Sequence, residues 1–375
     1  MASIHKRGPK KDGTYSYRLM WRDPEFGPRH ETFQDKTEAE IWKRLLDANG
    51  QSLAVATSLY ENAQLAGPTV VEALREHIAQ IVGATEYTIS RYEDDVRLHF
   101  SGDFGGLKLK GLKSADITRW VKWMEGRGKS PKTISLKHGL LSAAMETAVR
   151  HGHIDRNPCK GVRLPKKKRV GDDGDDITMG DYQTIRAHMD PHFHPFVDFL
   201  VGTGCRFSEA TALLGRDFDL DGNPPVVFIN KAHKLAAAGG RYVGSPKTEK
   251  SRRRVSLAPS TVTAVAPLVE KALKDGGPVF RMKRAGEFTA QAFYNRGWRD
   301  ARKAAGFGPG SQKHVTVHSL RHLHAALLLG NGMNMYELSR RLGHNNIQTT
   351  IDLYSSLLPD AHFRGAEVAT RALEI

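Results

Sequence analysis

The first 50 residues alternate between apolar and polar positions, and a helical period follows them. Residues 15–21 alternate with the period of a β-strand, and the turn-forming segment D-P-E-F-G-P separates them from a second strand at residues 30–33. T-E-A-E at residues 37–40 predicts a capping box that opens a helix, and Asn49-Gly50 predicts the end of that helix. These patterns predict a small β-sheet with one helix.

From residue 69 the apolar positions follow a helical period. A helical or frayed connector at residues 51–66 precedes this segment, and Gly67-Pro68 ends the connector. Ser130-Pro131 predicts a helix start, because Ser caps a first turn and Pro is tolerated there. The segment therefore predicts about four helices with short connections, at residues 69–81, 87–100, 114–124 and 130–151.

A basic run followed by an acidic run marks the clearest boundary in the chain. P-K-K-K-R at residues 165–169 is followed by G-D-D-G-D-D. Such blocks do not pack, so we expect an exposed linker, and its basic half fits either a nuclear-localisation patch or a segment lying along DNA. The chain accordingly divides into residues 1–66, 67–170 and 171–375.

Helices dominate the last of these parts. Residues 225–230 have the pattern of a short apolar strand. Residues 241–257 predict a hairpin with P-K-T-E-K-S as its turn and R-R-R-V-S-L as its returning strand. Helical patterns cover residues 177–189, 194–204, 261–274, 289–305, 318–329 and 335–342.

Length and composition fit a multidomain protein with a polyanionic partner. At 375 residues the chain exceeds one typical domain, and its net charge of +15, which ribosomal-type proteins, membrane-surface binders and DNA enzymes share, favours nucleic acid as the partner. Cys159 and Cys205 lack the spacing of a disulfide framework or a cysteine zinc site. With no long apolar run and no secretory pattern after Met1, we expect a cytoplasmic protein.

The positive charge is concentrated in the middle of the chain. Residues 67–170 contain 20 Lys and Arg against 11 Asp and Glu. Each basic residue is either a phosphate contact or part of a solvated face. The DNA-binding candidates are Lys6, Arg7, Lys10, Arg18, Lys129, Lys132, Lys137, Lys166, Lys167, Lys168 and Arg169.

Two short patterns place ionisable groups on one helix face. Arg206 and Glu209 are three residues apart, and a structural ion pair is the simplest interpretation of that spacing alone. His318 and Arg321 have the same spacing. His318, His322 and His324 raise the alternative of a metal site, which the arginine among them disfavours.

Tyr354 also has two interpretations. It follows Ile347 and Ile351 at helical spacing, so periodicity alone makes it a core residue. Its proximity in sequence to His344 makes it a candidate nucleophile that could meet an anion beside the histidines and Arg321.

The complete set of motifs resembles the tyrosine recombinase family, and phage integrases in particular. The set comprises Arg206, Lys247 in K-T-x-K-S-R-R-R-V-S-L, His318-x-x-Arg321, His344 in L-G-H and Tyr354, in that order. This resemblance covers residues 69–375. Residues 1–50 resemble the arm-type DNA-binding domain of lambda-like and conjugative-transposon integrases.

The resemblance implies a role for each of these residues. Tyr354 would attack the scissile phosphate and leave a 3′-phosphotyrosyl link, while Arg206 and Arg321 bind the non-bridging oxygens. His318 and His344 would donate hydrogen bonds, with His318 also a candidate base for the phenol. Lys247, or Lys250 in the same turn, would protonate the departing 5′ oxygen. Glu209 would support Arg206.

The resemblance also implies a multidomain α+β fold. Residues 1–66 would be an arm-type DNA-binding domain, a small three-stranded sheet plus helix, with its connector. Residues 67–170 would be a helical, SAM-like core-binding domain with the basic linker. Residues 171–375 would be a mostly helical catalytic domain with a small antiparallel sheet, in which residues 231–240 are an insertion of undetermined purpose.

The implied activity is site-specific integration and excision of a phage or mobile element. Because the tyrosyl link retains the phosphodiester energy, no cofactor or metal is expected. The expected partners are double-stranded DNA with core-type and arm-type sites, a homotetramer, an excision-directing factor and a host DNA-bending protein, in a nucleoid-associated setting in a bacterial host. The residues after Tyr354 would dock on a neighbouring protomer. Alternatives are a type IB topoisomerase-like enzyme, an Xer-type resolvase and a catalytically idle DNA-binding regulator.

Overall fold

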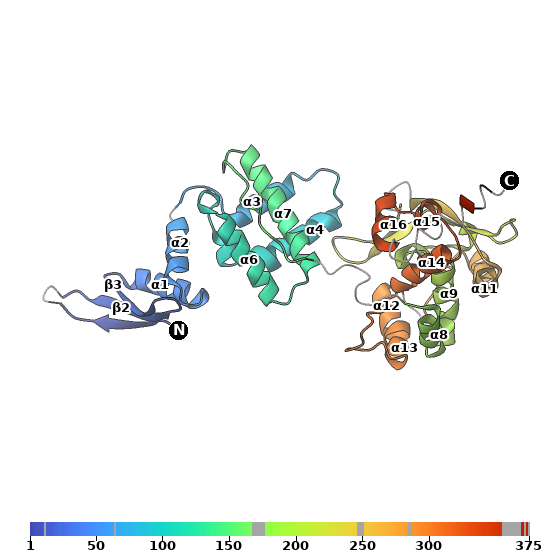
Figure 1. The fold of residues 1–375 in the computed structure, drawn as a ribbon, viewed down its shortest axis with the longest axis horizontal. Helices are drawn as coiled ribbons and strands as arrows, with labels where there is room; N and C mark the ends of the chain where they lie inside the picture. The colour runs from blue at the N-terminus through green and yellow to red at the C-terminus, as the bar shows by residue number, and fades with distance from the viewer. Residues whose placement is uncertain are drawn as a thin grey trace. The chain divides into compact units, whose positions relative to one another are not determined.

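A computed structural model gives the fold as two compact units, Met1–Lys167 and Lys168–Ile375 (Figure 1). The structure describes residues 1–10, 13–63, 65–166, 177–245, 251–283, 287–354, 369–370 and 373. Within these ranges no helix is long and apolar enough to cross a membrane.

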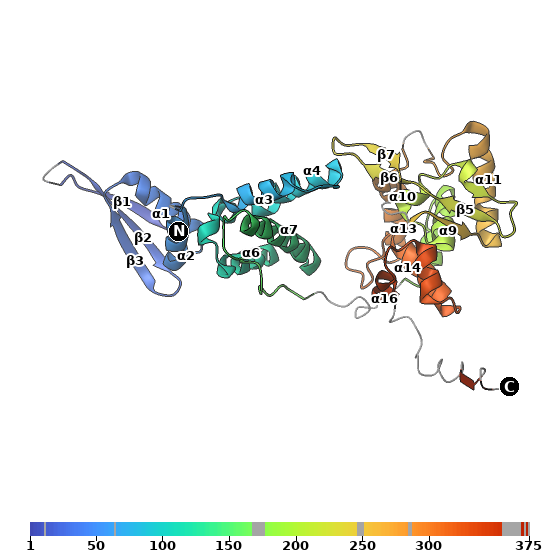
Figure 2. The ribbon, with the colours of Figure 1, turned by 90° about the horizontal axis from the view of Figure 1, so that it is seen from above.

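The first unit begins with a three-stranded antiparallel sheet. Its strands β1 (Ser3–Arg7), β2 (Ser16–Asp23) and β3 (Gly27–Phe33) lie in the order β1-β2-β3. The helices α1 (Lys36–Ala48) and α2 (Leu53–Ala63) lie beside this sheet (Figure 2). Leu19 and Trp21 of β2 are buried in a cluster with Leu46 of α1 and Ala56 of α2, as the alternation predicts. The predicted sheet and helix are thus confirmed.

The predicted capping box at residues 37–40 is wrong in its position. Asp35 caps α1 instead, and its carboxylate accepts the Thr37 and Glu38 N–H groups at 3.1 and 3.2 Å. The acidic side chain two residues earlier reaches the unpaired N–H groups of the first turn, so the helix begins sooner than the Thr-x-x-Glu pattern indicates.

A helical bundle completes the first unit. Trp120, Phe100 and Leu74 lie in its core, and Ser130 caps the last helix through the Thr133 N–H, as predicted. Asn62 of α2 donates to the Lys108 carbonyl at 3.0 Å, which ties the connector to the bundle. The helices are α3 (Val70–Ala79), α4 (Glu86–Asp95), α5 (Asp103–Gly106), α6 (Ser114–Gly126) and α7 (Pro131–Arg150).

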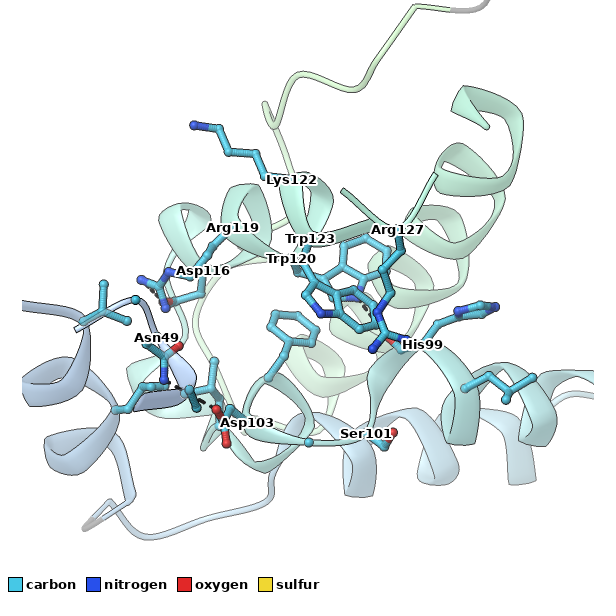
Figure 3. Close-up of a pocket in the computed structure, with 18 residues that line it drawn as sticks. Asn49, His99, Ser101, Asp103, Asp116, Arg119, Trp120, Lys122, Trp123 and Arg127 are labelled. Atoms are coloured by element: carbon cyan, nitrogen blue, oxygen red, sulfur yellow. Dashed lines mark hydrogen bonds and ion pairs between the residues drawn. The ribbon is translucent and has the colours of Figure 1, made fainter. Parts of the chain in front are cut away.

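A cavity of about 710 Å³ lies between the α1–α2 turn and this bundle (Figure 3). Trp120 and Trp123 of α6 form part of its wall, and the Arg127 guanidinium lies 4.6 Å from the Trp123 ring centre. The lining belongs to the first unit, whereas the predicted catalytic residues all belong to the second. The cavity is therefore separate from the candidate active site.

The second unit is mostly helical with two small antiparallel sheets. One contains β4 (Phe218–Asp219), β5 (Val226–Ile229) and β8 (Arg253–Ser256), and the other contains β6 (Ala232–Leu235) and β7 (Arg241–Gly244). Its helices are α8 (Met179–Ala187), α9 (His194–Thr203), α10 (Phe207–Ala210), α11 (Pro259–Asp275), α12 (Ala290–Phe293), α13 (Arg299–Ala304), α14 (Ser319–Gly330), α15 (Met335–Leu342) and α16 (Ile347–Tyr354).

The predicted hairpin over residues 241–257 is wrong in its pairing. β7 pairs with β6, and β8 pairs with β5 through the register Ile229↔Arg253. The Ala- and Gly-rich segment before residue 241 thus supplies a strand and a turn, and residues 245–252 connect two different sheets. The sequence pattern located the strands but did not encode which partner each strand takes.

Two hydrophobic clusters hold the elements of the second unit. A large cluster rich in phenylalanine packs α9, α12 and α14 against the sheet. A smaller cluster joins α14, α15 and α16 through Leu338, Leu342 and the ring of Tyr354. The second cluster brings the end of α16 against the helix that begins after His318.

Candidate active site

Arg206 and Glu209 form the centre of the site in the second unit. Gly204 ends α9 in the left-handed conformation, with φ of +66°, and Arg206 then caps α10. The Arg206 guanidinium donates to Glu209 Oε1 at 2.8 Å, and its backbone N–H donates to Oε2 at 3.0 Å. The Arg206 side chain remains 36% exposed whereas Glu209 is buried, so the arginine is held in place while still facing solvent.

Arg253 shares the Glu209 carboxylate. This buried residue donates from Nη2 to Glu209 Oε2 at 2.8 Å and from Nε to the Arg341 carbonyl at 2.7 Å. Burial by itself would raise the pKa of Glu209, but hydrogen bonds and charge from Arg253 and Arg206 lower the pKa to about 2. Glu209 is therefore ionised, and it balances one of the two guanidinium groups that contact it.

Sequence reasoning missed Arg253, although a signal for it exists. In β8 the residues alternate between buried and exposed, so Arg253 and Val255 face the interior while Arg254 faces solvent. The apolar Val255 and Leu257 mark the inward face of the strand, and Arg253 shares their parity. The middle residue of R-R-R was thus predictable as the inward-facing one.

Arg321 is buried near the beginning of α14 and joins two chain segments. Its Nη1 donates to the Gly204 carbonyl at 2.6 Å, and its Nη2 donates to the Leu342 carbonyl at 2.7 Å. Burial and the nearby Arg206 lower the pKa of Arg321 to about 10, so it stays charged at neutral pH. Two of the five N–H donors of the guanidinium hold this position.

His318 and His344 lie close to both arginines. Desolvation, His322, Arg321 and Arg206 lower the pKa of His318 to about 4, although part of its side chain remains exposed. Burial, followed by Arg321 and Arg206, lowers the pKa of His344 to about 4 as well. Both imidazoles are therefore neutral at pH 7 in the protein alone.

The turn after α15 fixes His344. Gly343 adopts φ of +69°, and the His344 N–H donates to the Ser339 carbonyl at 3.0 Å. His344 Nδ1 lies 2.7 Å from the buried Thr350 hydroxyl of α16. This contact uses Nδ1 and orients the ring, so Nε2 is the nitrogen that can address a substrate.

Tyr354 combines the two roles that its sequence position allowed. Its ring is 2% exposed and packs in the cluster formed by α14 and α15. Its hydroxyl lies 3.0 Å from His322 Nδ1. The proposed base for this phenol was His318, but the structure places His322 at hydrogen-bond distance instead.

The histidine-rich stretch is divided between different tasks. His324 is buried, its Nδ1 lies 2.7 Å from the Val201 carbonyl, and its Nε2 accepts from Arg341 Nε at 3.1 Å. His318 and His322 meet edge to face, with ring centres 5.1 Å apart. His324 thus serves the packing of α14, and the three histidines do not converge on one point as metal ligands would.

Comparison with known proteins identifies the family. Residues 178–360 match the model of the phage integrase family. The putative prophage phiRv2 integrase of Mycobacterium tuberculosis is 27% identical over 267 residues, covering 70% of this chain and 68% of the relative. Residues 178–360 therefore belong to the phage integrase family, and the matches together support a tyrosine recombinase of the phage integrase type.

Solved structures give the same fold. The Tn1549 transposon integrase in complex with a circular intermediate DNA matches with a TM-score of 0.68 at 22% identity, covering 82% of this chain and all of that one. A lambda integrase tetramer bound to a Holliday junction matches with a TM-score of 0.58 at 18% identity, covering 94% of each chain. These structures give the integrase fold, whereas the family match and the integrase relatives support the activity of a site-specific DNA recombinase.

The recombinase site adjoins a wide basic groove of about 1270 Å³. His344 lies in its lining together with Arg252 and Arg254 of the β8 region and Tyr336 and Arg340 of α15. Lys247 and Lys250 lie outside the described residues, as do Lys167, Lys168 and Arg169. The roles expected of these five residues stay predictions.

The recombinase's DNA-binding candidates in the first unit differ in availability. Arg7, Lys129, Lys132 and Lys166 are exposed, whereas Arg18 is half-buried. Lys6 lies over the Tyr15 ring, with Nζ 3.5 Å from its centre, and Lys10 donates to Gln34 at 2.8 Å.

Lys137 was predicted to contact DNA, but the structure pairs it with Asp95. Their charged atoms lie 2.5 Å apart, and the two side chains are 15% and 9% exposed. Removing the lysine would leave a buried carboxylate without its partner, so this residue serves the bundle. We therefore omit Lys137 from the DNA-binding set.

Proposed function

We propose that Tyr354 attacks a DNA phosphodiester and that His322 takes the proton from its phenol. The observation behind this proposal is the 3.0 Å contact between the Tyr354 hydroxyl and His322 Nδ1 beside Arg321, Arg206 and His344. The phenol oxygen bonds to phosphorus, and the bond from phosphorus to the 5′ oxygen breaks. A free phenol with a pKa near 10 is only about 0.1% ionised at pH 7, so the step needs such a base.

Arg206 and Arg321 stabilise the charge that develops on the phosphate. Glu209 is occupied by Arg253 as well as by Arg206, so the buried carboxylate does not cancel the positive charge offered to the substrate. His344 donates from Nε2, and His318 donates a further hydrogen bond. Donors preorganised in this way are usually the largest contribution to such catalysis.

The departing 5′ oxygen takes its proton from Lys247 or Lys250. Both lie in sequence between β7 and β8, outside the described residues. The proton count then balances, because one proton enters His322 and one leaves the lysine, and religation reverses both transfers.

The first unit supplies two kinds of DNA contact. Residues 1–66 are the arm-type domain, whose sheet exposes Met20 and Arg22 opposite the face covered by α1. Residues 67–170 are the core-type domain, in which Lys129, Lys132 and Lys166 contact phosphates of the DNA. The DNA phosphates release counterions when these lysines bind, which favours association at low salt.

The recombinase acts as a homotetramer on paired sites to integrate and excise a phage or mobile element. The match to the lambda integrase tetramer on a Holliday junction supports this assembly. An excision-directing factor and a host DNA-bending protein set the direction of the reaction, which takes place at the bacterial nucleoid. We expect the segment after Tyr354, most of which lies outside the described residues, to dock on a neighbouring protomer.

Recombination of a plasmid carrying two sites tests the proposal. The sites are first selected from a random duplex library by the full chain. Wild type and Tyr354→Phe should bind them equally, but only wild type should recombine them. Tyr294→Phe, at an exposed tyrosine outside the lining of the basic groove, is the matched control and should retain recombination. Recombination by Tyr354→Phe would overturn the proposal.

A further inference from the structure

Two histidines and a glutamate converge in the first unit, away from the recombination chemistry of the second. Glu76 belongs to α3, whereas His151 and His153 follow the last turn of α7. His151 Nδ1 lies 2.7 Å from Glu76 Oε1, and His153 Nε2 lies 3.3 Å from Oε2. The potential ligand atoms of all three side chains lie within 4.8 Å of one another.

The backbone of the His-Gly-His turn holds both rings on the same side. Gly152 adopts φ of +73°, a conformation that glycine tolerates and that commonly ends a helix. The His151, Gly152 and His153 N–H groups donate to the Thr147, Val149 and Ala148 carbonyls at 3.0, 3.0 and 2.9 Å. The turn is therefore ordered by α7 itself, and it places two imidazoles next to α3.

The donor set suits a transition-metal dication. Imidazole nitrogens with one carboxylate oxygen are ligands typical of Zn²⁺, whereas Mg²⁺ and Ca²⁺ prefer oxygen alone. Bonds of roughly 2.0–2.1 Å in a tetrahedron separate ligand atoms by about 3.3 Å. The His153–Glu76 distance of 3.3 Å matches that separation, whereas the His151–Glu76 distance of 2.7 Å is that of a hydrogen bond, so His151 would move away from the carboxylate when the ion binds.

The cluster is accessible to an ion from solvent. The side chains of His151, His153 and Glu76 are 33%, 31% and 36% exposed. This exposure gives an entry path and leaves the fourth coordination position to water. Hydrogen bonds between the carboxylate and the imidazoles account for the same geometry without an ion. The two interpretations differ in whether the three side chains bind Zn²⁺ when it is added.

We propose that Glu76, His151 and His153 bind Zn²⁺ and thereby link α3 to the end of α7. These helices pack together in the core of the bundle, so the ion would stabilise the first unit without taking part in strand transfer. The inference is independent of the function proposed for Tyr354.

Titration of the untagged full chain with ZnCl₂ after EDTA treatment and dialysis tests the site. Calorimetry should show that wild type binds one equivalent of Zn²⁺ per chain with high affinity. CoCl₂ should produce visible absorption bands of an ion with nitrogen and oxygen ligands. Thermal unfolding of the first unit should shift upward with Zn²⁺ and return with EDTA.

Two variants and two controls locate the ion. Glu76→Gln and His153→Gln should each weaken Zn²⁺ binding by more than the roughly 10- to 100-fold that loss of a supporting group around a metal costs. His30→Gln, at an exposed histidine of β3, and His322→Gln should leave it unchanged. Metal-free circular dichroism checks that each variant folds. No Zn²⁺ binding in folded wild type would show that the cluster is an ion pair only. Equal binding in all variants would show that Zn²⁺ binds elsewhere on the chain. Either result would overturn the proposal.

Discussion

At the scale of single residues, the site depends on how its charges are shared. Glu209 contacts Arg206 and Arg253, and Tyr354 contacts His322. Burial, and after it the neighbouring positive groups, lower the pKa of His318 and of His344. The free enzyme therefore holds neutral imidazoles beside charged guanidiniums at neutral pH.

Titration of the histidines tests this charge state. His318 and His344 should titrate with midpoints near 4 in the protein without DNA, since their pKa values are lowered to about 4 from the ordinary value near 6.5. Because these pKa values are lower in the folded state, the two groups add to stability as pH rises through the window from about 4 to 6.5. NMR of the ring Cε1–H signals, assigned with His318→Gln and His344→Gln, measures the midpoints. Midpoints near 6.5 would contradict this charge state.

The identity of the base gives a second prediction. His322→Gln should slow cleavage by about 10²- to 10⁴-fold, the usual range for a general base, and make the remaining rate rise with hydroxide concentration. His318→Gln should slow cleavage but keep the wild-type pH profile. Single-turnover cleavage of a nicked substrate between pH 6 and 9 measures both. The reverse pattern would assign the base to His318.

At the scale of elements, local patterns gave most helices and strands but not their pairing. The helices around residues 130–151 and 335–342 follow from apolar spacing and caps, and the structure confirms them. The exchange of partners between β7 and β8 did not follow, because strand pairing is set by contacts distant in sequence. The contact between His322 and Tyr354 was not predicted either, because the two residues are 32 positions apart in the sequence.

The order of the motifs predicted the candidate site better than any one motif. Taken alone, Arg206 is typical of a structural ion pair with Glu209. Taken alone, Arg321 is a single charged residue in a histidine-rich helix. The structure brings them together through the Gly204 carbonyl, which accepts from Arg321 two residues before Arg206. Arg253 was missed because the basic run around it has the composition of a solvated strand. Only its position, two residues before the buried Val255, shows that its side chain faces the interior.

Arg253 provides a prediction at this scale, because it joins β8 to α15 and to Glu209. Arg253→Met should lower the free energy of unfolding by about 3–5 kcal/mol, since it leaves a buried carboxylate with one partner fewer. Arg254→Met, at the exposed neighbour, should change it by less than about 0.5 kcal/mol. Urea unfolding of the second unit, followed by fluorescence, measures both. Equal effects would show that the inward position of Arg253 is unimportant.

At the scale of the whole molecule, the chain comprises two compact units, and three parts were predicted from the sequence. The division between the units falls at Lys167 and Lys168, inside the basic run at residues 165–169, and the division into three parts stays a prediction. Residues 1–66 and 67–166 form one unit, although their sheet and bundle have separate hydrophobic clusters. They form one unit because Leu59 and Asn62 of α2 pack against the bundle. The composition of the sequence does not reveal this contact.

The role of the N-terminal sheet is tested by a deletion designed around α2. Removing residues 1–50 keeps Leu59 and Asn62, which the bundle needs, and removes the sheet and α1. The truncated chain should bind the crossover site as before and lose binding to a second, distinct sequence. Selection of both proteins on a random duplex library measures this. Identical selected sequences would contradict the arm-type assignment.

The central claim is that Tyr354 forms the covalent link to DNA, and trapping that link tests it most directly. A nicked suicide substrate releases the strand beyond the cut, so the protein cannot reseal it. Mass spectrometry of the digested adduct should find a nucleotide joined through its 3′ phosphate to the peptide that contains Tyr354, and Tyr354→Phe should form no adduct. A nucleotide on another residue, or an undiminished adduct in Tyr354→Phe, would contradict the claim.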